Sequence, residues 1–169
     1  MYKTINIFIN NIGIPIENVI NISEDPKLFE IPTINKIIEF SKLHQCDSIL
    51  YLHTKGVSHS DDYHELNDWI DLMLYFLLKK SNKSLLKGKT PLNDFDCIGC
   101  NYKLDPLPHF SGNFWWANCN YLSTLPLIKG NERNDAEFHL FKNNPKWKSL
   151  HDSTVNHYHE VYPKELYQN

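Results

Sequence analysis

A strand, a helix and a second strand follow one another near the start of the chain, and this order constrains the fold most strongly. Apolar and more polar residues alternate over residues 4–10, which predicts a strand. Pro32 suits the first turn of a helix, and isoleucines then recur at helical spacing until about residue 45. An apolar run over residues 48–53, stopped by Gly56, predicts the second strand. A strand–helix–strand unit of this size is typical of a parallel sheet.

The rest of the chain continues the alternation of helices and strands. A capped helix is predicted to begin at Asp62 and to run to Lys80, with apolar residues at helical spacing. Residues 96–102 predict a further strand, residues 120–125 a short helix, and residues 133–141 another helix. We therefore expect an α/β fold with a mixed, mostly parallel, Rossmann-like sheet flanked by helices.

Length and composition narrow the class of protein. A chain of 169 residues corresponds to one domain, and no internal repeat or low-complexity linker divides it, so we expect a single domain over residues 1–169. Hydrophobic residues make up 41% and charged residues 22%, which excludes a disordered chain. A net charge of -3 argues against a general nucleic-acid-binding protein, because such proteins present a basic face.

No targeting signal is visible in the sequence. No apolar run approaches the roughly 18 residues of a membrane span, and the first residues lack the charged-then-apolar pattern of a secretion signal. We therefore expect a cytoplasmic protein without a transmembrane segment. The same absence favours free thiols for the four cysteines, which are Cys46, Cys97, Cys100 and Cys119. Cys97 and Cys100 have the spacing of metal ligands, but on a strand they would point to opposite faces, which disfavours zinc.

The segment Pro108–Asn118 combines four large aromatic residues with a Ser-Gly-Asn turn. A turn between a strand and a loop exposes backbone amides and small polar groups, which suit a flat, hydroxyl-rich ligand. We therefore predict sugar contacts, for donor or acceptor, from His109, Ser111, Gly112, Asn113 and Trp115. On a strand Trp115 and Trp116 point in opposite directions, so only one can face a cleft, and core packing is the alternative for either.

A second polar cluster follows the predicted strand over residues 48–53. Ligands of α/β sheets gather at the carboxyl ends of strands, and the chain there reads His53, Thr54, Lys55 and Gly56. Lys55 offers a positive charge for a phosphate, and the glycine lets the backbone approach an anion. We predict that these four residues bind a diphosphate. The alternative is that His53 only completes the strand end and that Lys55 is solvated.

Four segments form a longer pattern: residues 29–33, Tyr51–Gly56, Asp68-Trp69 with Met73, and His109–Ala117. In order and spacing they resemble a family of glycosyltransferases from polysaccharide and lipopolysaccharide gene clusters, bacterial or viral, with relatives in large DNA viruses. The aromatic run also resembles, more loosely, a strand of nucleotide-diphosphosugar transferases with the GT-A fold. The resemblance implies a GT-A-like fold, a nucleotide-sugar donor and a polysaccharide or glycolipid acceptor. It therefore implies a glycosyltransferase, with hexosyl-type transfer.

A transferase of this kind needs a group that deprotonates the acceptor hydroxyl. Asp135-Ala136-Glu137 opens the helix after the aromatic segment, where the resemblance places a carboxylate base. We favour Glu137 over Asp135, because Asp135 also suits a helix cap. In the alternative interpretation both carboxylates only complement the helix dipole.

The metal requirement stays open at this point. GT-A enzymes usually hold Mn²⁺ or Mg²⁺ on an Asp-X-Asp motif after the central strand, and here that place reads His53-Thr54-Lys55. Lys55 is an alternative source of positive charge for the leaving group. His157 and His159 would share one face of an extended segment and are weak candidates for metal ligands. They also permit a histidine-based metallohydrolase as a third interpretation.

The resemblance further implies a truncated N-terminus, because Met1 falls where related enzymes have already completed their base-binding strand. A partner chain or an oligomer is one way to complete the nucleotide site. The main alternative to glycosyl transfer is therefore a non-catalytic remnant that binds a glycan or a nucleotide.

Overall fold

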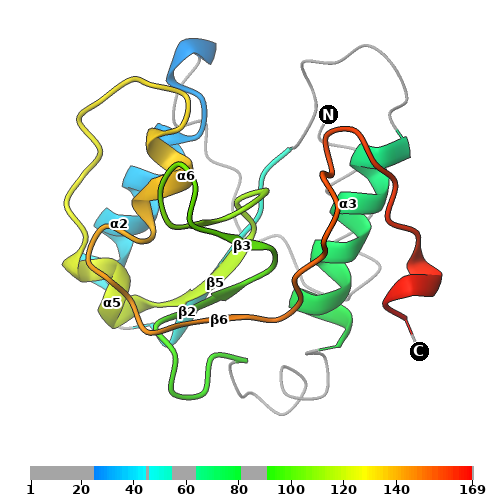
Figure 1. Cartoon of the computed structure of the whole chain (residues 1–169). Coiled ribbons are helices and arrows are strands. Elements are labelled where there is room, and N and C mark those ends of the chain that lie inside the picture. The colour runs from blue at the N-terminus through cyan, green and yellow to red at the C-terminus, as the bar shows by residue number, and fades with distance from the viewer. Residues whose placement is uncertain (1–24, 45, 55–63, 81–90, 169) are drawn as a thin grey trace.

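The computed structural model describes residues 25–44, 46–54, 64–80 and 91–168 (Figure 1). The strand predicted over residues 4–10 and the helix start predicted at Asp62 lie outside the described residues. None of the described helices has the length and apolar character that a membrane span requires.

Helices and strands alternate along the described chain. The helices are α2 (Ile31–Leu43), α3 (His64–Leu74), α5 (Cys119–Thr124) and α6 (Asp135–His139). Shorter helical turns are η1 (Pro26–Leu28), η2 (Tyr75–Lys79), which continues α3, and η3 (Lys164–Leu166). The strands are β1 (Ser48–Tyr51), β2 (Cys97–Gly99), β3 (Tyr102–Lys103), β4 (His109–Phe110), β5 (Trp115–Asn118) and β6 (Trp147–Ser149). The α/β class predicted from the sequence is therefore confirmed.

The central sheet is small and mixed. Its four described strands follow the order β1-β5-β2-β6, while β3 and β4 form a separate two-stranded ribbon. Strand β6 runs parallel to β2, but β5 runs antiparallel to both β1 and β2. The prediction of a mostly parallel sheet is thus wrong for the described part of this sheet, in which two of the three strand pairings are antiparallel. The reason is that β5 enters the sheet between β1 and β2 and points against both.

Helices cover both faces of this sheet (Figure 1). Helices α2, α5 and α6 pack on one face together with Tyr51, Trp115 and Ala117. Helix α3 and the C-terminal segment pack on the other face, where Phe114 is buried and Trp116 lies against the cluster. Trp115 and Trp116 therefore point to opposite faces, as the alternation of a strand predicts.

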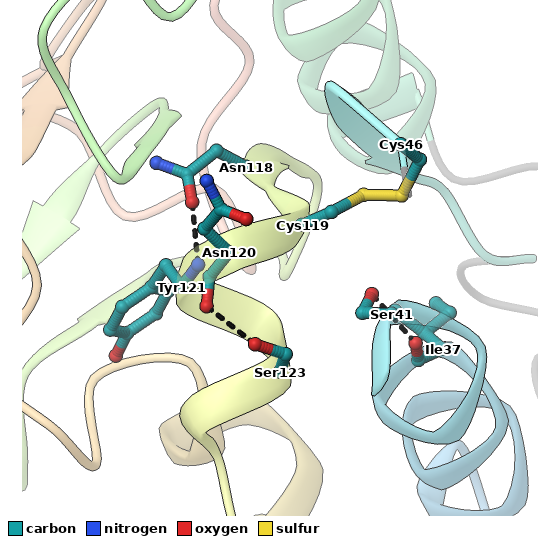
Figure 2. Close-up of a disulfide and its surroundings, with 8 residues drawn as sticks. All are labelled: Ile37, Ser41, Cys46, Asn118, Cys119, Asn120, Tyr121 and Ser123. Atoms are coloured by element: carbon teal, nitrogen blue, oxygen red, sulfur yellow. Dashed lines mark hydrogen bonds between the residues drawn. A yellow bond between two sulfur atoms is a disulfide. The ribbon is translucent and has the colours of Figure 1, made fainter. Parts of the chain in front are cut away.

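The predicted helix starts agree with the structure where local signals are strong. Pro32 lies in the first turn of α2, and Ile34 and Ile38 bury the apolar face of that helix. Helix α5 begins after Asn118, whose side-chain oxygen accepts a hydrogen bond of 2.6 Å from the backbone N–H of Tyr121 (Figure 2). Helix α6 is shorter than the predicted 133–141 and spans only five residues.

Two of the four cysteines form a disulfide, which corrects the expectation of free thiols (Figure 2). The backbone N–H of Cys119 donates to the carbonyl of Asp47, and this contact brings the start of α5 against the start of β1. The Cα atoms of Cys46 and Cys119 are therefore 5.7 Å apart, within bridging range. Cys97 and Cys100 are free and buried, and burial is the main reason that their pKa values are raised. A disulfide is typical of oxidising compartments, so the cytoplasmic location stays a prediction.

Candidate functional site

The Ser-Gly-Asn turn predicted from the sequence connects β4 to β5. Gly112 and Asn113 both have left-handed backbone conformations, with φ of 94° and 56°. A Cβ atom on Gly112 would lie 2.6 Å from the sulfur of Met73 and 3.1 Å from the ring of Trp69. Only glycine satisfies both the conformation and the close approach to α3.

Glu30, which directly precedes α2, is the centre of a hydrogen-bonded network around this turn. Its Oε2 atom accepts a bond of 2.7 Å from Nδ2 of Asn113, and its Oε1 atom lies 3.2 Å from Nδ1 of His53. The other ring nitrogen of His53, Nε2, donates to the carbonyl of Gly112 at 3.1 Å. The network joins the start of α2, the end of β1 and the turn before β5.

His53 therefore has an acceptor at each ring nitrogen. An imidazolium ring can donate to both the carboxylate and the carbonyl, whereas a neutral ring can donate to only one of them. The side chains of His53 and Glu30 are 15% and 30% exposed, so both are partly accessible to solvent. Burial, followed by the negative charge of Glu30, raises the pKa of the neighbouring Tyr51 hydroxyl.

A second histidine–carboxylate pair joins β4, the strand before the turn, to helix α6. Nδ1 of His109 donates to the carbonyl of Leu107 at 2.7 Å, and Nε2 lies 4.0 Å from Oε1 of Glu137. The ring of His109 also contacts Phe138 edge to face at 5.3 Å between centroids. The two polar side chains are 9% and 23% exposed. The structure thus brings together two residues that the sequence placed in separate motifs.

Tyr158 connects the two pairs electrostatically. Desolvation of its hydroxyl and then the carboxylate of Glu137 raise the pKa of Tyr158, and Glu30 adds to this effect while Arg133 opposes it. The residue is nevertheless 64% exposed, and its ring packs against Trp69. The Tyr158 hydroxyl is therefore within electrostatic reach of both carboxylates.

A comparison with known families matches most of the sequence. The model of a family described as a domain of unknown function (DUF8361) matches residues 3–163. The chain belongs to this family. The match includes both histidine–carboxylate pairs and the Gly112–Asn113 turn, so the site is part of the DUF8361 domain. No curated protein and no solved structure matches the chain.

The structure of this DUF8361 domain also describes Trp115, Ser111 and Thr54 of the predicted sugar and diphosphate site. Trp115 is only 2% exposed, and its Nε1 atom donates to Oδ1 of Asn113 at 3.0 Å, so it supports the turn from the core. The backbone N–H of Ser111 donates to the carbonyl of Asn101 at 3.0 Å. Thr54 follows His53 and is partly exposed. Lys55 and Gly56 lie outside the described residues.

Asp135 and Glu137 differ in their surroundings. Oδ2 of Asp135 accepts a bond of 3.1 Å from the backbone N–H of Glu132, which holds the chain at the start of α6. Asp135 also lines a shallow pocket of about 440 Å³ between α6 and residues 126–130. Glu137 instead faces His109. The preference for Glu137 over Asp135 as a catalytic base stays a prediction.

His157 and His159 do not share one face, which corrects the prediction made for an extended segment. Residues 157–159 form a turn, with His157 buried and His159 exposed. Nε2 of His157 accepts hydrogen bonds from Ser153 Oγ at 2.6 Å and from Asn101 Nδ2 at 3.2 Å. Within residues 25–44, 46–54, 64–80 and 91–168, no group of three or more His, Cys, Asp or Glu side chains could hold a metal ion.

Sequence reasoning assigned no role to Glu30 or Tyr158. Glu30 stands immediately before the proline-started helix α2, within the first segment of the longer pattern, and this position was the available signal. Tyr158 belongs to a tail rich in histidine and tyrosine, where no spacing distinguishes one ring from another.

Proposed function

We propose that this chain is a glycosyltransferase that moves a sugar from a nucleotide-diphosphate sugar to a hydroxyl of a polysaccharide or glycolipid. The sequence pattern suggested this chemistry, together with a GT-A-like fold. The observation that carries the proposal is that Glu30 and His53 bond to the Gly112–Asn113 turn, while His109, on the strand before that turn, pairs with Glu137. A site of this kind combines proton-transfer groups with a rigid turn that can orient sugar hydroxyls.

Each part of the proposed site has a separate task. Glu137, which pairs with His109, is a candidate base for the acceptor hydroxyl, whereas Asp135 accepts a hydrogen bond at the start of α6. The turn supplies Gly112 and Asn113 beside the reacting sugar, and Glu30 holds that turn in place. The leaving diphosphate carries negative charge, which Lys55 or a divalent cation would offset.

The first test is thermal unfolding of the purified chain with a panel of UDP-, GDP- and dTDP-sugars, each with and without Mn²⁺. A ligand that binds only the folded state stabilises it by about 2.7 kcal/mol at a hundredfold excess over the dissociation constant. The sugar that stabilises the chain is then used to measure transfer. We expect wild-type turnover, and a loss of turnover with retained folding in Glu137→Gln. No stabilisation and no transfer with any donor would refute the proposal.

The rival function is binding of a glycan or nucleotide without catalysis. It is favoured by the position of His53, because both ring nitrogens already face acceptors within the protein instead of a diphosphate. This function predicts stabilisation by a free nucleotide or glycan, no turnover in the wild type, and the same stabilisation in Glu137→Gln. The two functions are therefore separated by the turnover measurement alone.

A further inference from the structure

We propose that His109 is the group that removes the proton from the acceptor hydroxyl, and that Glu137 stabilises the imidazolium that results. This inference rests on the proposed glycosyl transfer and assigns the base within that site. It makes His109, first expected to be a sugar contact, the base, and it changes the role of Glu137 from base to partner of the protonated imidazole.

The hydrogen bond to Leu107 determines where His109 accepts a proton. Because a carbonyl can only accept, the Nδ1 atom 2.7 Å from it must carry the hydrogen. In the neutral ring the lone pair therefore lies on Nε2, the atom on the Glu137 side. A base needs this arrangement, with one nitrogen held by the protein and the other directed at the substrate.

The distance to Glu137 fits an ion pair and not a hydrogen bond. At 4.0 Å, Nε2 of His109 and Oε1 of Glu137 are too far apart for a hydrogen bond but close enough for an ion pair. In the proposed step the acceptor hydroxyl binds to Nε2 beside the carboxylate. Once Nε2 is protonated, the negative charge of Glu137 stabilises the cation.

Two other histidines, His53 and His139, have ring contacts that differ from those of His109. His53 has protein acceptors at both ring nitrogens, so neither is directed at a substrate. His139, on the same helix as Glu137, uses Nε2 to contact the carbonyl of Pro126, and burial lowers its pKa. His109 alone among these three combines a carbonyl at Nδ1 with a carboxylate near Nε2.

The proposed step balances as a substitution at the anomeric carbon. The acceptor O–H bond breaks, and its proton moves to Nε2 of His109. The freed electron pair on the acceptor oxygen forms the bond to the anomeric carbon. The bond from that carbon to the diphosphate oxygen breaks, and the leaving nucleoside diphosphate keeps its electron pair.

The test compares His109→Gln with His44→Gln, in which an exposed histidine at the end of α2 is changed in the same way. For each protein we would measure donor-induced stabilisation and the rate of transfer against pH. Loss of a general base typically lowers a rate by about 10²- to 10⁴-fold. We expect that loss in His109→Gln, with donor stabilisation kept and with the decline of the rate at acid pH removed. Rates in His44→Gln should equal those of the wild type.

The outcomes separate this inference from the proposed function. If the wild type transfers sugar and His109→Gln does so equally well, the assignment of the base is wrong while the transferase function stands. If the wild type transfers no sugar from any donor, both are wrong. A long-range ¹H–¹⁵N NMR spectrum gives a second measurement that needs no turnover. It should show the hydrogen of neutral His109 on Nδ1, and a hydrogen on Nε2 instead would overturn the inference.

Discussion

The disulfide between Cys46 and Cys119 makes a quantitative prediction about stability. The bridge joins positions 73 residues apart, and it connects the start of β1 to the start of α5. Cross-linking distant positions lowers the entropy of the unfolded chain and so favours the folded state. Reduction of this bond, or replacement of both cysteines by alanine, should therefore destabilise the protein.

The loop length sets the expected size of the effect. For a separation of 73 residues, the chain-entropy relation gives about 15 cal/mol/K, which is about 4.4 kcal/mol at 25 °C. A chain of 169 residues has an unfolding entropy of about 0.35 kcal/mol/K near its midpoint. The melting temperature should thus fall by about 12 °C.

Thermal unfolding with and without a phosphine reductant is the assay, together with a count of thiols in denaturant. The oxidised protein should show two thiols, from Cys97 and Cys100, and the reduced protein four. A variant with alanine at positions 46 and 119 is the matched control, because reductant should leave its melting temperature unchanged. Four thiols before reduction would refute the bridge itself. Two thiols before reduction, with no fall in melting temperature after it, would refute the entropic argument.

Three further predictions concern the turn and a buried histidine. Gly112→Ala should destabilise the protein by about 1–3 kcal/mol in urea unfolding, because the left-handed backbone and the sulfur of Met73 leave no place for a Cβ atom; an unchanged midpoint would contradict this. Trp115→Phe should lower the free energy of unfolding by about 1 kcal/mol beyond the effect of the smaller ring, because Asn113 loses a hydrogen-bond donor. A double-mutant cycle with Asn113→Ala measures the coupling between the two side chains. Burial lowers the pKa of His139 from its ordinary value of 6.5, so the unfolded chain binds more protons than the folded one just below that pH. Stability should therefore fall as the pH drops below about 6.5, and His139→Gln should flatten that dependence in urea titrations at several pH values.

The sequence predicted the elements that local signals specify. Pro32 and the isoleucines that follow specify α2, and the apolar run over residues 48–53 specifies β1, because each pattern depends on neighbours within a few residues. The disulfide and the contact between Glu30 and Asn113 join residues 73 and 83 positions apart. Hydrophobic periodicity and capping signals span only a few residues, so they could not predict either contact.

The antiparallel direction of β5, which the sequence did not predict, is what brings His53 to the Gly112–Asn113 turn. The register pairs Tyr51, the last residue of β1, with Trp115, the first residue of β5. Residues that follow β1 and residues that precede β5 must then lie at the same edge of the sheet, so His53 meets the carbonyl of Gly112. If β5 ran parallel to β1 with Trp115 beside Ser48, the residues before Trp115 would lie beyond the start of β1, at least five residues or roughly 17 Å from His53. The Gly112–Asn113 turn thus stands between β4, which carries His109, and β5, whose Trp115 supports the turn from the core.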